Sequence, residues 1–176
     1  MSFKKLPAPT NDTKAPEALA AHAGRTIQVA IGVLIDDSSS QRRLLVARRK
    51  GDTVLGGFWE FPGGKIESGE TAEQCVVREF AEELGLTVAV AQPLPVLEHT
   101  YAHGHVRLQP FICRLVSGSA VNLGVAEHRW IAPGKLRQFT FPPANGPLIE
   151  RLLAGNIEQN ESDGCTSVAG AIRRRP

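Results

Sequence analysis

The sequence predicts a mixed α/β (α+β) sandwich, in which helices pack against a mixed β-sheet. Two observations support this class: several segments are rich in β-branched and aliphatic residues, and two others carry helical signals. A chain of 176 residues corresponds to about one domain and can bury a core. Its composition, 42% hydrophobic and 22% charged, is that of a globular protein.

Strand signals occur at four places. Residues 26–35 (TIQVAIGVLI) and 43–49 (RLLVARR) flank the polar turn DDSSSQ, which predicts a β-hairpin. Residues 105–116 and 128–132 have a similar composition. Because Pro110 lacks the N–H that a sheet ladder needs, we expect the third strand to be an edge strand or to be bulged there.

Helical signals predict one helix over residues 71–84 and another over residues 144–154. The first helix has both ends marked. Thr71 with Gln74 three positions later is a capping-box pattern, and Gly85 is a typical C-terminal stop.

The residues of this first helix divide between two faces, at about 100° per residue. An apolar arc of roughly 140°, which we expect to face the core, contains Val76, Val77, Phe80, Ala81 and Leu84. On the opposite side, an arc of roughly 100° contains Glu79, Glu82 and Glu83. Like charges at this spacing repel one another, so another group should compensate for them.

The acidic face and the loop before it predict a site for a divalent cation. Arg78 can reach Glu82, but one guanidinium cannot neutralise three carboxylates. Clustered oxygen ligands are what Mg²⁺ or Mn²⁺ requires, above all when the ion also binds phosphates. The preceding FPGGK loop lets the backbone approach an ion or a phosphate, and Glu67 and Glu70 add carboxylates. A charged face that is merely solvated is the alternative.

Residues 64–86 resemble the Nudix box. That pattern is Gly, five residues, Glu, seven residues, Arg-Glu, an apolar residue, any residue, Glu-Glu, any residue, Gly and an apolar residue. Every defined position matches, through Gly64, Glu70, Arg78, Glu79, Phe80, Glu82, Glu83, Gly85 and Leu86. With average residue usage, the chance of such a match in a chain of this length is on the order of 10⁻⁷.

Resemblance to the Nudix hydrolases implies an α/β/α sandwich and hydrolysis of a nucleoside diphosphate linked to another group. It also implies Mg²⁺ (or Mn²⁺) as cofactor. The implied ligands are three carboxylates and one backbone carbonyl, those of Glu79, Glu82, Glu83 and Gly63.

The same resemblance implies catalytic roles beside the metal ligands. Arg78 would orient Glu79 or Glu82, and Glu70 would support the site. The group that takes the proton of the attacking water stays open between Glu79, Glu70 and Glu127. Glu127 could equally be a surface residue before a strand.

Three stretches resemble MutT-type enzymes within this family: WEFPGGKIESGET, LLVARR and FPPANGPLIERL. In that pattern the residue matching Asn145 faces the base, the backbone of Phe61 contacts the base, and Arg49 contacts phosphate. We add Lys65, the basic residue of the glycine loop, to the expected substrate-binding set. A helix N-cap, a core residue and a solvated cation are the respective alternatives for Asn145, Phe61 and Arg49.

The resemblance implies a nucleoside triphosphate pyrophosphohydrolase that converts 8-oxo-dGTP to 8-oxo-dGMP and pyrophosphate. An alternative is a pyrophosphatase for another nucleotide, such as a cytidine triphosphate, and a further one is a binding module without catalysis. One departure bears on the substrate. Where MutT-type chains tend to carry an Asp-Arg pair, this chain has His103, Gly104 and His105, which could bind phosphate or lie in a turn.

The net charge and the apolar pattern of the whole sequence indicate which partners and which location to expect. The net charge of +2 is too small to indicate a stable nucleic-acid complex or an anionic membrane as partner, so we expect a small-molecule substrate. No apolar run approaches about 18 residues, and the N-terminus lacks a secretory core, which favours the cytoplasm. The oligomeric state stays open.

We expect one Nudix domain over residues 25–155, between a disordered leader (1–24) and a polar tail (156–176). The tail ends in three arginines before the last proline, which we expect to be solvated rather than bound to nucleic acid. The three cysteines, Cys75, Cys113 and Cys165, have no metal or disulfide spacing and are expected to be reduced thiols.

Overall fold

The computed structural model describes residues 26–38, 40–53, 55–101 and 104–156. The predicted leader, the tail beyond Asn156 with its Cys165, and His103 lie outside these ranges. The strands are β1 (Thr26–Asp36), β2 (Arg43–Arg48), β3 (Trp59–Glu60), β4 (Gly63–Lys65), β5 (Thr87–Pro93), β6 (Leu97–Tyr101), β7 (Gly104–Ser117) and β8 (Glu127–Ile131). The helices are α2 (Ala72–Leu84), α3 (Gly146–Leu153) and two 3₁₀ helices, η1 (Pro133–Gln138) and η2 (Pro143–Asn145).

The described strands form one mixed sheet with the order β3-β2-β1-β7-β5. Off this path, β4 pairs with β1, β6 with β7, and β8 with β2. β1 runs parallel to β7, and the other pairs are antiparallel. The predicted hairpin is confirmed, because Ile35 of β1 lies opposite Leu44 of β2.

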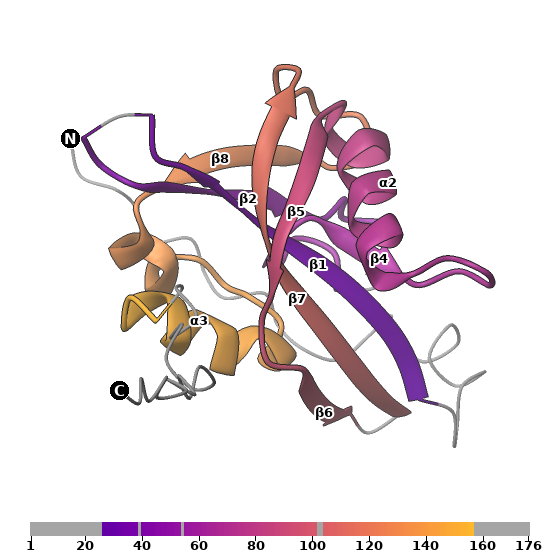
Figure 1. Cartoon of the computed structure of the whole chain (residues 1–176). Coiled ribbons are helices and arrows are strands. Elements are labelled where there is room, and N and C mark those ends of the chain that lie inside the picture. The colour runs from indigo at the N-terminus through magenta and orange to yellow at the C-terminus, as the bar shows by residue number, and fades with distance from the viewer. Residues whose placement is uncertain (1–25, 39, 54, 102–103, 157–176) are drawn as a thin grey trace, which may run out of the picture.

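Helices cover both faces of this sheet, which confirms the α/β/α sandwich (Figure 1). β1 alternates between the two faces: Ala30 and Leu34 pack on the α2 side, and Ile31 and Val33 pack on the side of η1 and α3. This alternation decides on which side of the sheet each strand side chain lies.

β7 is an interior strand, and its register with β1 is unbroken through Pro110, so both the edge position and the bulge expected there are wrong. On the side away from β1, however, its partner changes from β6 to β5 beside Pro110. The N–H of Leu94 donates to the Pro110 carbonyl at 2.8 Å. Since the amide nitrogen and the carbonyl of one strand residue point to the same side, the missing N–H falls where the partner strand is interrupted.

α2 has the predicted ends. Thr71 is its N-cap, with both hydrogen bonds of the capping box to Gln74, and Gly85 ends the helix with a left-handed φ of 67°. The second predicted helix, over residues 144–154, is divided into η2 and α3.

The buried face of α2 differs from the predicted one. Val76, Phe80 and Leu84 are buried as expected, whereas Val77 is 38% exposed and Ala81 is exposed. Cys75 is buried in their place. The helix is therefore turned by roughly 80° toward its acidic side, relative to the arc that its apolar residues define.

Candidate active site

Because α2 is turned toward its acidic side, its glutamates lie against β4. Gly64 lies opposite Ala30 of β1, on the α2 side of the sheet, and a Cβ atom at this position would overlap the Glu79 carboxylate. A side chain larger than hydrogen would therefore displace Glu79. The glycines that the sequence places before the helix let the carboxylate lie directly on the strand backbone.

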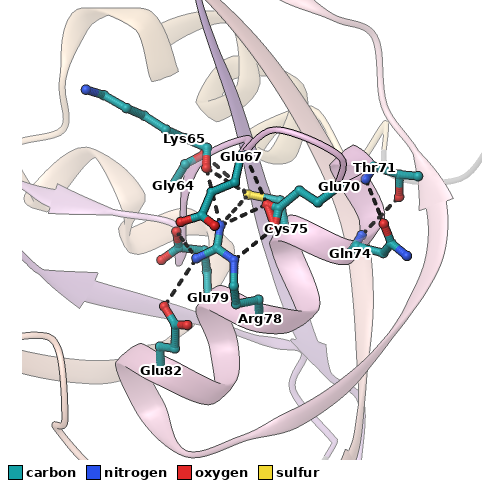
Figure 2. A network of polar contacts seen from close by, with 10 residues as sticks. All are labelled: Gly64, Lys65, Glu67, Glu70, Thr71, Gln74, Cys75, Arg78, Glu79 and Glu82. Carbon is teal, nitrogen blue, oxygen red and sulfur yellow. Dashed lines mark hydrogen bonds and ion pairs between the residues drawn. The ribbon is translucent and has the colours of Figure 1, made fainter.

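Arg78 joins the acidic residues into one network (Figure 2). Its Nε and Nη2 donate to the two oxygens of Glu70 at 2.9 and 3.0 Å. Its Nη1 donates to Glu79 at 2.9 Å and to Glu82 at 3.2 Å. One nitrogen of Arg78 thus contacts both of the carboxylates that were the alternatives for its expected orienting role.

Within this network, the pKa values of Glu70 and Glu79 are shifted in opposite directions. Hydrogen bonds from Arg78 lower the pKa of Glu70 to about 2. The pKa of Glu79 is raised, because burial of its carboxylate outweighs the hydrogen bond and charge of Arg78. Glu70 is therefore a fixed anion, whereas burial makes the charge of Glu79 costly.

Glu83 lies beside β4, where its carboxylate accepts a hydrogen bond from the backbone N–H of Gly63 at 3.4 Å. Burial raises its pKa to about 8, and the charges of Glu60 and Glu79 add to the shift. A divalent cation beside these carboxylates would reverse the repulsion between them.

Glu60 on β3 is a site residue that the sequence reasoning missed. Its side chain is only 12% exposed and binds Nη1 of Arg49 at 2.6 Å. Burial raises the pKa of Glu60 although Arg49 opposes the shift, and the charge of Glu79 raises it further. A signal was present in the sequence: Glu60 is a charged residue between two aromatic ones, Trp59 and Phe61, directly before the glycine loop.

The donor atoms of this cluster suit a divalent cation. Carboxylate and backbone carbonyl oxygens are the ligands that Mg²⁺ prefers. Within the described ranges, no three His, Cys, Asp or Glu side chains converge closely enough to hold an ion as they stand. Arg78 contacts one oxygen of Glu79 and one of Glu82, so the second oxygen of each carboxylate could turn toward an ion while Glu70 still holds Arg78 through two hydrogen bonds.

Glu127, a candidate base, is not brought to this cluster. It lies opposite Arg48 in the register of β8 with β2, and Arg48 lies opposite Trp59. Such partners project from the same face of a sheet, and Trp59 belongs to the core on the α3 side. Glu127 therefore faces away from α2, where it pairs with Arg129 and Arg48.

The residues expected to bind the base lie on the α3 side. Phe61 is fully buried and stacks on Phe141, with ring centroids 5.4 Å apart. Asn145 is 7% exposed and precedes α3, but its side chain makes no capping hydrogen bond. The neighbouring backbone N–H of Ala144 donates to the hydroxyl of Tyr101 at 3.4 Å.

Lys65 and His105 are two further residues considered as ligands of the substrate. The exposed side chain of Lys65 extends away from the carboxylates (Figure 2). His105 lies on β7, so the turn expected as one alternative for it is wrong, and its Nδ1 lies 2.8 Å from the hydroxyl of Thr100, its partner on β6.

The fold and the site together define a class: α/β/α proteins in which a helix and a glycine strand present carboxylates whose oxygens suit a divalent cation. The chain belongs to the NUDIX domain family, whose model matches residues 30–151. This confirms the family expected from the sequence.

Named relatives narrow the resemblance. The chain is 33% identical over 128 residues to the 8-oxo-dGTP diphosphatase of Escherichia coli (strain K12). The alignment covers 73% of this chain and 97% of that enzyme. It is 29% identical over 133 residues to the CTP pyrophosphohydrolase of the same organism, covering 74% and 93%. A crystal structure of a MutT NUDIX hydrolase from Burkholderia pseudomallei is similar with a TM-score of 0.63 and 26% identity, covering 72% and 97%.

Among the described residues, no helix is both long and apolar enough to span a bilayer.

Proposed function

We propose that the protein is a Mg²⁺-dependent nucleoside triphosphate pyrophosphohydrolase of MutT type. Its substrate would be 8-oxo-dGTP, and its products 8-oxo-dGMP and pyrophosphate, which removes an oxidised nucleotide from the precursor pool. The observation that carries the proposal is the cluster of Glu79, Glu82 and Glu83 beside the glycine strand. The named 8-oxo-dGTP diphosphatase supports the choice of substrate.

Glu79, Glu82, Glu83 and the Gly63 carbonyl would hold the cation, which supplies charge stabilisation for the diphosphate and acidifies a bound water. Arg78 orients Glu79 and Glu82 through its Nη1. Arg49, held by Glu60 on the α2 side, is the cation we expect to contact the phosphates.

Contacts within the site support one of the three candidate bases. Glu70 has both carboxylate oxygens engaged, by Arg78 and by the N–H of Glu67. Glu127 faces the other side of the sheet. Glu79 contacts Arg78 through one oxygen and lies at the centre of the cluster, so it is the base we propose.

Asn145 is the residue we propose to read the base. An amide offers both a donor and an acceptor, so it can pair with O6 and with the N7 hydrogen that oxidation to 8-oxoguanine creates. Its side chain is buried without a capping bond, which favours this role over the N-cap. A pocket built around such a pair discriminates against bases that leave the amide unpaired.

The similarity to a CTP pyrophosphohydrolase makes cytidine triphosphates the second candidate substrate class. Enzymes of that type tend to carry an acidic residue at the position of Asn145, and this chain does not. We expect the reaction to take place in the cytoplasm, where the triphosphate precursors are found.

The test is pyrophosphate release with Mg²⁺ from oxidised and normal triphosphates, nucleotide sugars and dinucleoside polyphosphates. The intact chain should show its highest kcat/KM on 8-oxo-dGTP. Glu82→Gln should lose activity, whereas Glu73→Gln, which alters an exposed glutamate in the first turn of the same helix, should retain it. Equal and negligible release from the intact chain and from Glu82→Gln would instead support a binding module.

A further inference from the structure

Two cysteines in the described part of the chain, Cys75 and Cys113, have fully buried thiols, and they differ in their contacts. The sulfur of Cys75 lies 3.4 Å from Nη2 of Arg78, and 3.6 and 3.5 Å from the carbonyl oxygens of Gly64 and Lys65 (Figure 2). The sulfur of Cys113 lies 3.9 Å from the carbonyl of Phe111, away from the carboxylate cluster.

The contacts of Cys75 match what a thiol can donate and accept. Its sulfur accepts from the guanidinium, and its single hydrogen can donate to either of the two β4 carbonyls or to the carboxylate of Glu70. Burial raises the pKa of this thiol to about 11, so the hydrogen stays in place. Cys75 also precedes Arg78 by three residues, which puts the two side chains on the same face of α2.

The position of Arg78 matters to the whole cluster because its Nη1 contacts both Glu79 and Glu82. On the opposite side, its Nη2 contacts Glu70, the Lys65 carbonyl at 3.3 Å and the Cys75 sulfur. Glu70 fixes the guanidinium relative to the loop before the helix. The Lys65 carbonyl and the Cys75 thiol fix it relative to β4.

We propose that Cys75 is a positioning residue, whose thiol links Arg78 to β4 and thereby sets where Glu79 and Glu82 stand relative to the glycine strand. The inference rests on the proposed function insofar as catalysis is one of its readouts. Bonds to a thiol are weak, so the effect of removing them should appear in the geometry of the cluster more than in the free energy of unfolding. A shift of a few tenths of an ångström should lower kcat roughly three- to tenfold, since a shift of about 1 Å can cost about 100-fold.

The experiment compares Cys75→Ala, Cys75→Ser and Cys113→Ala by steady-state kinetics with 8-oxo-dGTP and Mg²⁺. Cys75→Ala should lower kcat about three- to tenfold with KM unchanged within about twofold. Cys75→Ser keeps one donor and one acceptor and should restore kcat to within about twofold of the parent. Cys113→Ala removes an equally buried thiol and should leave kcat unchanged even where it lowers Tm.

A double-mutant cycle tests the route through Arg78. If Cys75 acts through Arg78, Cys75→Ala should add no further loss of kcat in an Arg78→Lys background. Full additivity of the two losses would overturn the inference, as would a kcat for Cys75→Ala equal to that of Cys113→Ala. Should Cys75→Ala not fold, Cys75→Val fills the space without a polar hydrogen, and a kcat within about twofold of the parent would contradict the proposal.

A second readout does not depend on the substrate. Hydrogen exchange of the Arg78 side-chain N–H groups, followed by NMR in the metal-free protein, should be faster in Cys75→Ala and unchanged in Cys113→Ala. Unchanged exchange in both variants would refute the link to Arg78. Because this result is independent of turnover, it distinguishes failure of the inference from failure of the proposed activity.

Discussion

Gly64→Ala is the sharpest perturbation of the site, because its methyl group would overlap the Glu79 carboxylate. Non-bonded carbon atoms rest about 3.5–4.0 Å apart, so the carboxylate has to move by roughly 1 Å or more. A displacement of that size can lower kcat by about 100-fold. The free energy of unfolding should change by only about 1 kcal/mol or less, since the group that moves is the end of a flexible side chain.

The assay is kcat for pyrophosphate release at saturating Mg²⁺ and 8-oxo-dGTP, with Tm measured in parallel. Gly134→Ala is the matched control, because a Cβ atom at that position meets no atom within 4 Å. It should have the parental kcat and Tm. If Gly64→Ala keeps a kcat within about tenfold of this control, close contact between the Glu79 carboxylate and β4 is not required, and the reasoning fails.

Three further predictions concern the shifted pKa values of Glu70 and Glu83 and the side-chain amide of Asn145. The pKa of Glu70 is lowered from 4.5 to about 2, so its ion pair stabilises the fold above pH 4.5 and is lost as the pH falls toward 2. Tm should therefore fall less steeply over that range in Glu70→Gln than in the parent, and equal slopes would contradict this. The pKa of Glu83 is raised to about 8, so its burial destabilises the metal-free fold as the pH rises. The gain in Tm on adding Mg²⁺ should then be larger at pH 8 than at pH 5, and Glu83→Gln should remove the difference; a gain independent of pH would argue against a cation at Glu83. Asn145→Ala should raise KM for 8-oxo-dGTP far more than KM for an unselective triphosphate, and equal increases would remove the base-reading role.

The ends of α2 and its acidic residues could be predicted from sequence, because both depend on short-range spacing. Thr71 and Gln74 satisfy each other's hydrogen bonds locally, and Gly85 adopts its left-handed conformation without long-range help. The rotation of the helix could not be predicted in this way. The apolar pattern predicts that Val77 lies in the core, whereas Glu79 lies against β4 and Val77 is 38% exposed.

Sheet contacts were harder to predict because register is a long-range property. Nothing within the segment that contains Glu127 shows which face of the sheet it occupies, and its pairing with Arg48 decides this. Pro110 predicts an edge strand or a bulge because its missing N–H is visible in the sequence, whereas the interruption between β5 and β6 is a tertiary feature. Glu60 is not predicted for the same reason, since its partners are Arg49, which directly follows β2, and Glu79 on α2.

The concentration of acid in residues 63–86 is best explained by a division of tasks among the carboxylates. Glu70 takes two hydrogen bonds from Arg78 and stays an anion, so it holds the arginine whether or not a cation is bound. Burial raises the pKa of Glu79 and Glu83, which means that their charges are costly in the metal-free chain. A divalent cation would turn the same charges from repulsive to attractive, so the energetic cost of burying them would be offset when the ion binds. Glu82, whose side chain is 59% exposed, is the least constrained of the set and can turn from Arg78 toward the ion at the smallest cost.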